Sequence, residues 1–270
     1  MNSGDGWTMP GPDAGGPPQA WPPGHPAQPG HPAQPGQWMP PPPVAWTHTA
    51  YSRLGGLAVA VSVLLALVGV ANLGLVAVLA QRRTLLQRLI DDPGSVTTSE
   101  AEDSDAAVAG VSGVYLLALL AAGIVFIVWF YRVRRNGQMF AEHLQRRGQG
   151  WAVGGWFCPV VNLWFPYQIA CDALDAANFA AVSRVAGQPV AVGRRRYPLV
   201  TTWWVLFLAG GILSGLAVRF PDDTIERMVT ATTTNIAGSA LEIVAACLAI
   251  AVVRQITRAQ EDQRPTQPWH

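Results

Sequence analysis

Few residues in this chain have the types and the spacing that catalysis requires. Asp172 and Asp175 lie three residues apart in a stretch of helical periodicity, so their carboxyl groups are one turn apart, as in acid/base sites. Only Gln168 shares their face, and we therefore interpret the pair as the solvated face of an amphipathic helix. The HExxH, GxSxG and P-loop patterns are absent from the sequence. We expect no catalytic residues and no enzyme activity.

Glu242 is the acid most suggestive of a functional site, because it lies inside an otherwise apolar run. An ionisable side chain within lipid costs at least about 2.5 kcal/mol. A rise of about 1.5 Å per helical residue puts Glu242 roughly 12 Å and Asn72 roughly 14 Å from the same membrane face. We therefore expect these two side chains to hydrogen-bond, with Ser112 and Ser214 nearer that face. Two roles stay open: a structural link between helices, or a relay for protons or cations.

The chain that carries these residues is too apolar for a soluble domain, with 50% hydrophobic and 13% charged residues. Four runs with no charge, or with Glu242 alone, can cross the roughly 30 Å of hydrocarbon in a bilayer. They lie at about residues 54–80, 106–131, 198–218 and 234–253. The sequence predicts an all-α integral membrane protein, with four transmembrane helices in a domain over residues 51–256. The acids at 100–105 are predicted to form a solvated loop between the first two spans.

Residues 150–186 carry a different pattern from these four spans. Pro159 and Pro166 would each remove about 3 kcal/mol of helix stability inside lipid, so this segment is not predicted to cross the membrane. We expect a cytoplasmic interfacial segment that ends in an amphipathic helix from Pro166 to about Ala186. A re-entrant course stays open. The interfacial motif combines aromatic, polar and proline residues: Trp151, Trp156, Pro159, Asn162, Trp164, Pro166, Tyr167 and Gln168.

The arginines indicate the orientation of the chain. All eighteen basic residues are arginine, and with four spans thirteen of them share the side of both chain ends. The positive-inside rule therefore predicts a multi-pass protein of the cell (inner) membrane with both termini in the cytoplasm. A fifth span over residues 151–176 would place the arginines of the C-terminal tail outside, against that rule. Four of these arginines are expected to bind anionic headgroups: Arg184, Arg194, Arg195 and Arg196. The alternative is that they only set the topology.

The two ends of the chain are predicted to lie outside the membrane domain. Residues 1–46 hold fourteen of the 22 prolines, so residues 1–50 should form a disordered cytoplasmic tail. Within it, Pro40 to Pro43 suit a protein partner that binds proline-rich segments, with a solvated spacer as the alternative. Residues 257–270 are predicted to be a short C-terminal tail.

Cysteine and histidine spacing predicts no metal site and no cofactor. The three cysteines, Cys158, Cys171 and Cys247, form no CxxC pair and have no histidine at ligand spacing. The arginines do not gather in one basic domain, so no nucleic-acid partner is implied.

Three stretches resemble a known family. They are WFYRVRRNG at residues 129–137, GWAVGGWFCPVVNLWFPYQ at residues 150–168, and the pair Trp203–Trp204 that opens the next span. They are similar to the actinobacterial membrane-protein family filed as domain of unknown function 4328. The resemblance covers about Tyr51 to Ile256 and is specific chiefly in the GW, PxxNLWxP and PYQ elements. It implies a multi-span membrane protein and supplies no activity.

Together these features favour a non-enzymatic membrane scaffold with a membrane-hugging tryptophan-rich segment and a tail that recruits partners. The alternative is a small transporter or channel component that uses Glu242. The interactions that we expect are with membrane lipids, including anionic ones, and with a protein partner of the tail. A homo-oligomer stays open.

Overall fold

The computed structural model describes residues 51–219 and 223–264. These residues form seven α-helices and one short 3-10 helix, without a strand. Four helices among them are long and apolar enough to cross a membrane. These are α1 (Gly55–Asp91), α2 (Thr98–Ala141), α6 (Pro198–Ala217) and α7 (Ile225–Glu261). The predicted all-α class with four membrane-spanning candidates is confirmed, whereas the predicted proline-rich tail lies outside the described residues.

The helix ends differ from the predicted spans where local capping extends them. The Thr97 side chain accepts a hydrogen bond from Glu100 N, and the Glu100 carboxylate accepts one from Thr97 N at 2.9 Å. This reciprocal capping starts α2 at Thr98, so the acids that we expected in a loop form its first two turns. At the other end of the chain, α7 continues to Glu261, and the first residues of the predicted C-terminal tail are helical.

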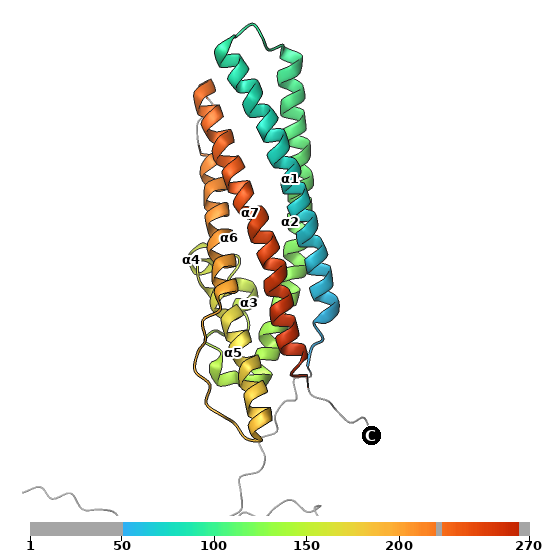
Figure 1. Cartoon of the computed structure of the whole chain (residues 1–270), viewed down its shortest axis with the longest axis vertical. Coiled ribbons are helices and arrows are strands. Elements are labelled where there is room, and N and C mark those ends of the chain that lie inside the picture. The colour runs from blue at the N-terminus through green and yellow to red at the C-terminus, as the bar shows by residue number, and fades with distance from the viewer. Residues whose placement is uncertain (1–50, 220–222, 265–270) are drawn as a thin grey trace, which may run out of the picture. The chain divides into compact units, whose positions relative to one another are not determined.

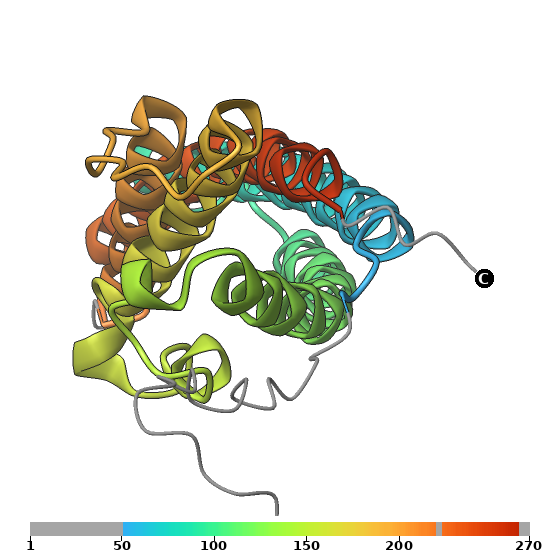
Figure 2. The same ribbon diagram turned by 90° about the horizontal axis from the view of Figure 1, so that it is seen from below.

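The four long helices form an open arc. α2 contacts α1, α1 contacts α7, and α7 contacts α6, whereas the backbones of α2 and α6 do not approach each other within the part of the chain that the structure describes. α1 and α6 run in one direction, and α2 and α7 run in the other (Figure 1). Helix α5 (Phe165–Ala186) contacts α2, α6 and α7 and closes one end of the arc (Figure 2). We call this the α5 end, and the opposite end, with the turn at residues 92–97, the loop end.

The tryptophan-rich segment is broken into short pieces. Its elements are α3 (Trp151–Gly154), α4 (Pro159–Asn162) and the start of α5, which follow the 3-10 helix η1 (Glu142–Leu144). At Gly155 an added Cβ would lie 2.7 Å from the Trp151 carbonyl oxygen, so the turn after α3 requires glycine. Pro159 opens α4 and Pro166 lies in the first turn of α5, where a missing N–H costs nothing. A single fifth span over residues 151–176 is therefore wrong.

Helix α5 corrects the predicted amphipathic pattern. Its end at Ala186, followed by Gly187 with φ of +69°, agrees with the sequence. Its expected solvated face does not exist, because Asp172 is only 1% exposed and Asp175 only 3% exposed. α2, α6 and α7 contact α5 on one side, and the loops before α3 and after α5 hydrogen-bond to it on the other. The acid pair therefore lies inside the protein.

Aromatic side chains fill the arc next to α5. Trp129 donates from Nε1 to the Thr257 hydroxyl at 3.1 Å, and Trp204 donates to the Leu163 carbonyl oxygen at 2.8 Å. Their ring planes lie mostly edge-on or tilted to their neighbours, which is the favourable geometry for aromatic pairs. The cluster contains rings from α2, α6 and the segment after α3: Phe126, Trp129, Phe130, Trp156, Trp203, Trp204 and Phe207. This half of the arc is a packed apolar core.

The start of α1 is held by two side chains from distant parts of the chain. The Glu261 carboxylate accepts hydrogen bonds from Leu54 N at 2.8 Å and from Gly55 N at 3.3 Å. A carboxylate at this place satisfies free N–H groups and complements the positive end of the helix dipole. Asn136 binds both backbone groups of Ser52, at 3.0 Å and 2.9 Å. The chain therefore enters α1 along a fixed path at the α5 end.

Candidate functional site

A polar cluster links all four long helices. Glu242 Oε2, on α7, accepts hydrogen bonds from Asn72 Nδ2 of α1 at 3.1 Å and from the Tyr115 hydroxyl of α2 at 2.9 Å. Glu242 Oε1 accepts from the Ser214 hydroxyl of α6 at 2.9 Å. We call these four residues the Glu242 cluster. It contains the hydrogen bond that the sequence predicted between Glu242 and Asn72.

Two glycines bring α6 and α7 together at this level. A Cβ added to Gly238 would lie 2.6 Å from the Ser214 hydroxyl and 2.9 Å from Ser214 N. A Cβ added to Gly210 would lie 2.9 Å from Cγ of Glu242. Small residues allow helix backbones to approach closely within a membrane. This close crossing places the Ser214 hydroxyl beside the Glu242 carboxyl group.

Asn72 has one atom that the cluster does not satisfy. Its side chain is only 1% exposed, and Nδ2 also lies 3.5 Å from the Ser239 carbonyl oxygen. Its Oδ1 is buried and has no hydrogen-bond donor among the described residues. Buried polar atoms normally have a partner, so this unpartnered amide oxygen is an exception that needs an explanation.

The α2 residue that joins the Glu242 cluster is one that the sequence analysis did not single out. Ser112 makes no hydrogen bond to the Glu242 cluster among the described residues, and Tyr115, about one turn further along, makes it instead. A tyrosine in the middle of an apolar span was the available signal, because its hydroxyl needs a polar partner away from water. Tyr115 meets that need with Glu242.

One face of α7 changes character at Glu242. Towards the loop end, a polar residue recurs at the three- or four-residue spacing of a single helical face: Thr232, Asn235, Ser239 and Glu242. Towards the α5 end, the same spacing carries buried apolar residues: Ala245, Ala249, Val252 and Ile256. This pattern was readable in the sequence and was missed. Polar groups therefore lead from the cluster to the loop end, and the packed core closes the other direction.

The second acid site is a network around α5. Asp172 Oδ1 lies 2.8 Å from Arg146 Nε and 3.0 Å from a terminal nitrogen of Arg194. Asp172 Oδ2 accepts from the backbone N of Arg146 at 3.0 Å. The Asp175 carboxylate accepts from the Tyr197 hydroxyl at 2.7 Å. We call these five residues the α5 network, and it ties two loops to one helix.

The surroundings of the α5 network favour the neutral forms of two side chains: Tyr197, which belongs to the network, and Cys171, which precedes Asp172 in the chain. Burial, followed by the hydrogen bond to Asp175, raises the pKa of the Tyr197 phenol above its usual range. Burial also raises the pKa of the Cys171 thiol to about 11. A neutral phenol donates to a carboxylate, and a neutral thiol is a poor nucleophile. The arrangement suits the holding of loops rather than acid/base chemistry.

Two of the four proposed headgroup arginines have protein partners. Arg194 binds Asp172, and Arg184 donates to the carbonyl oxygens of Asp262 and Gln263 at 3.1 Å and 2.9 Å. Arg184 therefore caps the C-terminal end of α7, where a positive charge is favourable. The side chains of Arg195 and Arg196 are exposed and make no hydrogen bond or ion pair within the described residues.

The interfacial motif divides into an exposed set and an internal set. Trp151 and Trp164 are exposed, and Pro159 is exposed beside them. Pro166 is buried, and Trp156 belongs to the aromatic core. The exposed set continues with the neighbouring apolar residues Phe157, Val160 and Leu163.

The remaining motif residues bind their neighbours. The Tyr167 hydroxyl lies 3.2 Å from the Thr201 hydroxyl, and Gln168 Oε1 accepts from Arg147 Nε at 2.9 Å. The Arg147 guanidinium also lies 4.0 Å from the centre of the Phe165 ring. Asn162 Oδ1 is buried without a partner among the described residues.

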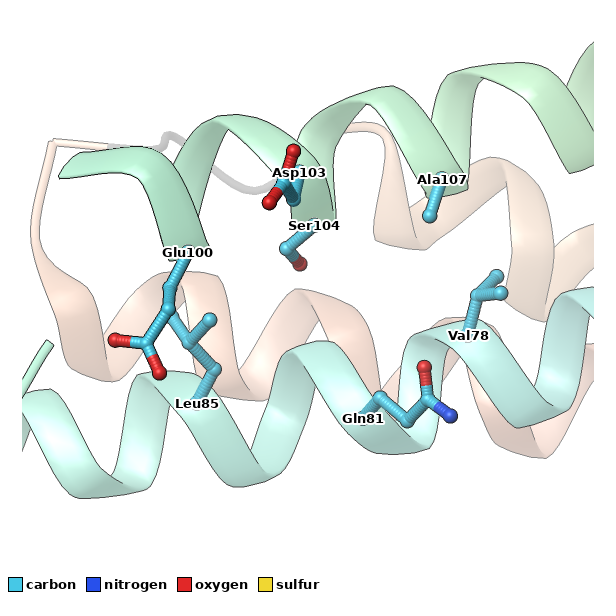
Figure 3. A pocket seen from close by; sticks show the side chains of 7 residues that line it. All are labelled: Val78, Gln81, Leu85, Glu100, Asp103, Ser104 and Ala107. Atoms are coloured by element: carbon cyan, nitrogen blue, oxygen red, sulfur yellow. The ribbon is translucent and has the colours of Figure 1, made fainter. Parts of the chain in front are cut away.

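A shallow cavity of about 280 Å³ lies between α1 and α2 at the loop end (Figure 3). An ion pair between Arg82 and Asp105, and another between Arg88 and Glu100, join the two helices there. No group of three or more His, Cys, Asp or Glu side chains in the described residues is arranged to hold a metal ion. The lining residues are Val78, Gln81, Leu85, Glu100, Asp103, Ser104 and Ala107. This cavity is a surface depression next to paired charges.

Comparison with known families gives one match. A family model with the description Domain of unknown function (DUF4328) matches residues 92–258, more than half of the chain. The matched range begins after α1, later than the resemblance suggested, and includes Glu242 and the α5 network but not Asn72. Comparison with curated proteins and with solved structures finds no match. The chain belongs to the DUF4328 family, and its described residues include four helices suited to a membrane.

Proposed function

We propose that the protein is a non-enzymatic scaffold of the cell membrane, with its α5 end in the cytoplasm and residues 150–164 in the inner membrane interface. The supporting observation is a group of exposed apolar side chains: Trp151, Phe157, Val160, Leu163 and Trp164. Phe157 is 72% exposed. Such a patch is unfavourable in water, whereas tryptophan is favoured at headgroup depth. α4 projects from the side of the arc beside α6 (Figure 1).

The charge distribution supports this orientation. Thirteen of the eighteen arginines belong to segments at the α5 end, and five belong to segments at the loop end. Residues 51 and 264, where the described chain begins and ends, both lie at the α5 end. The positive-inside rule then places that end in the cytoplasm. We propose that the proline-rich tail lies in the cytoplasm and binds partners there.

The scaffold role is further supported by how the acids of the α5 end are used. Asp172 and Asp175 bind Arg146, Arg194 and Tyr197, and thereby hold two loops against α5. This network holds the loops at the α5 end, the end that we propose to face the cytoplasm. Exposed Arg195 and Arg196 add positive charge that anionic headgroups would bind, at about 1 kcal/mol per arginine.

An environment-sensitive fluorophore tests the interfacial placement. It is attached to Phe157→Cys or to Val185→Cys, in a chain whose three native cysteines are replaced by alanine and which is reconstituted in lipid nanodiscs. Val185 is 91% exposed in the last turn of α5 and is the matched control. We expect a blue-shifted emission, quenched by lipid with a shallow nitroxide, only at position 157. Equal emission and quenching at the two positions would reject the placement.

Cross-linking in native membranes tests the scaffold role. The full chain is compared with a chain that lacks residues 1–46, at equal expression. We expect protein adducts that depend on the tail and resist washing at high salt. If the two chains give the same adducts, the tail recruits nothing and the scaffold role is wrong.

A transporter or channel component is the second candidate, because the polar face of α7 leads from the loop end to Glu242. Ion flux into proteoliposomes is measured for the wild-type chain and for Glu242→Gln, which keeps the shape and the hydrogen bonding. Flux that survives this substitution, or no flux with either protein, rejects a transport role for Glu242.

A further inference from the structure

We propose that the Glu242 cluster is a binding site for one Na⁺ ion, reached from the loop end. The proposed ligands are the Glu242 carboxylate, the Ser214 hydroxyl, the Ser239 carbonyl oxygen and the Asn72 amide oxygen, which takes the place of Nδ2 when the amide turns. Tyr115 positions the carboxylate through its hydroxyl group. The inference concerns binding alone and does not rest on the scaffold role.

The first argument is charge. The three side chains that contact the Glu242 carboxylate are an amide and two hydroxyls, and all are neutral. The ion pairs found in the described residues involve other acids. A lone negative charge among membrane-spanning helices is costly, and it is neutralised by a proton or by a bound cation. The Glu242 carboxylate therefore has no positively charged partner among the described residues.

The second argument is the unpartnered oxygen. Asn72 Oδ1 is buried in a side chain that is only 1% exposed, and it has no donor within the described residues. Nδ2, not Oδ1, now faces the Glu242 carboxylate and the Ser239 carbonyl oxygen, so a proton and a cation both reach the amide oxygen only after the amide turns. With Oδ1 turned to the place of Nδ2, a proton on Glu242 would join two of these oxygens. A cation would bind the carboxylate, the amide oxygen and the Ser239 carbonyl oxygen together.

The donor set selects the class of ion. Every nearby ligand atom is a hard oxygen from a carboxylate, an amide, a hydroxyl or a backbone carbonyl. Transition metals favour histidine and cysteine, neither of which contributes here. One carboxylate balances the charge of a monovalent cation, whereas calcium sites generally contain several carboxylates. The hydroxyl of Ser214 can turn its hydrogen away from the ion, since a hydroxyl both donates and accepts.

The third argument is access. Thr232, Asn235 and Ser239 lie on the face of α7 that leads from the loop end to Glu242. The Thr233 hydroxyl, further along, accepts from Arg83 Nε at 3.0 Å. Beyond Glu242 the face is apolar and packed into the core, with Ala249, Val252 and Ile256. An ion would therefore enter and leave on one side only.

Carbodiimide labelling tests the site. A hydrophobic carbodiimide modifies protonated carboxyl groups in apolar surroundings, and peptide mass mapping locates the adduct. The full chain is labelled in nanodiscs at one pH, in NaCl or in choline chloride of equal ionic strength. At a Na⁺ concentration ten times the dissociation constant, we expect the labelling of Glu242 to be about tenfold slower, because only the empty site reacts. Choline should give no protection.

Two serine variants separate binding from general effects of salt. Ser214→Ala removes one proposed ligand and should reduce the protection by Na⁺ several-fold. Ser112→Ala removes a hydroxyl from α2 that makes no hydrogen bond to the cluster, and should leave the protection unchanged. Equal loss of protection in both variants would contradict the assigned ligands.

Thermal unfolding gives a second readout that does not require labelling. Na⁺ should raise the midpoint temperature of the wild-type chain relative to choline, and Glu242→Gln should abolish this difference. If the labelling and the midpoint respond to pH but are the same in Na⁺ and choline, the site binds only a proton and the proposal is wrong. An absence of any Na⁺ effect in both measurements overturns it equally.

Discussion

Two acids of this protein, Asp172, which is buried, and Glu242, which is half-buried, meet different partners. Asp172, at the α5 end, is met by the guanidinium groups of Arg146 and Arg194. Glu242, among the long helices, is met only by an amide and two hydroxyls. The loops before α3 and after α5 can carry arginines because they are not part of the spanning helices. An arginine beside Glu242 would itself have to be buried in lipid, which is costly. The two sites show that location limits the available partner.

Removal of the Asp172 charge should have the largest effect on stability. Asp172→Asn leaves Arg146 and Arg194 facing a buried amide, and we expect a loss of about 3 kcal/mol of unfolding free energy, since one partner of a buried pair is removed. The measurement is chemical unfolding in mild detergent, followed by circular dichroism.

The matched control for this change is Asp223→Asn. Asp223 pairs with Arg227 on an exposed helix start, where the loss should stay below about 0.5 kcal/mol. By contrast, Glu242→Gln should change stability by less than about 1 kcal/mol in choline, because the glutamine carbonyl oxygen can accept from Asn72 and Tyr115 while its NH2 group donates to the Ser214 hydroxyl. Equal losses of unfolding free energy for Asp172→Asn and Glu242→Gln would contradict the proposed difference between the two sites.

Disruption of the close crossing of α6 and α7 should cause the next largest loss of unfolding free energy. Gly238→Ala forces a methyl group against Ser214 and should cost about 2 kcal/mol, as other overpacked substitutions do. Gly211→Ala introduces the same methyl group on α6, where nothing lies within 4 Å, and should be neutral. Unfolding of the two variants under the same conditions gives the comparison, and only Gly238→Ala should also weaken protection by Na⁺.

A pair of tyrosine variants compares one hydrogen bond in each site. Tyr197→Phe removes a 2.7 Å bond to the ionised Asp175 and should cost about 2 kcal/mol. Tyr115→Phe leaves Glu242 with Asn72 and Ser214 and should cost about 1 kcal/mol. Chemical unfolding measures both, and a larger loss for Tyr115→Phe would show that the Glu242 cluster depends on its hydroxyl more than its remaining donors indicate.

Alkaline pH should weaken the α5 end gradually. Burial raises the pKa of Cys171 from 9.0 to about 11, so the folded state holds this proton more tightly than the unfolded state. The resulting stabilisation is complete below about pH 9 and is lost as pH rises towards 11. A pH series of unfolding midpoints should show this decline, and Cys171→Ala should reduce its slope.

Much of the membrane domain was predictable because it depends on local composition. The length of the apolar runs predicted four long helices, and the prolines at 159 and 166 predicted that the segment between them would not form one span. Glu242 and Asn72 were paired by depth alone, since helices of known direction and rise place residues at known heights.

The fate of the acid pair on α5 was not predictable from spacing. We interpreted the pair as solvent-exposed, but Asp172 binds Arg146 and Arg194. These arginines lie 26 residues before it and 22 residues after it, and no local sequence pattern joins them to it. Tyr115 and the polar face of α7 were visible in the sequence and were overlooked. The contact of Gly238 with Ser214 depends on how α6 and α7 cross, which the separate spans do not specify.

The bond from Glu261 to the start of α1 has a consequence for biosynthesis. A ribosome delivers α1 first, yet the carboxylate that satisfies Leu54 N lies 207 residues further along the chain. The N–H groups at the start of α1 therefore have no carboxylate partner until α7 has been synthesised. The capping of α1 therefore depends on synthesis of the chain as far as Glu261.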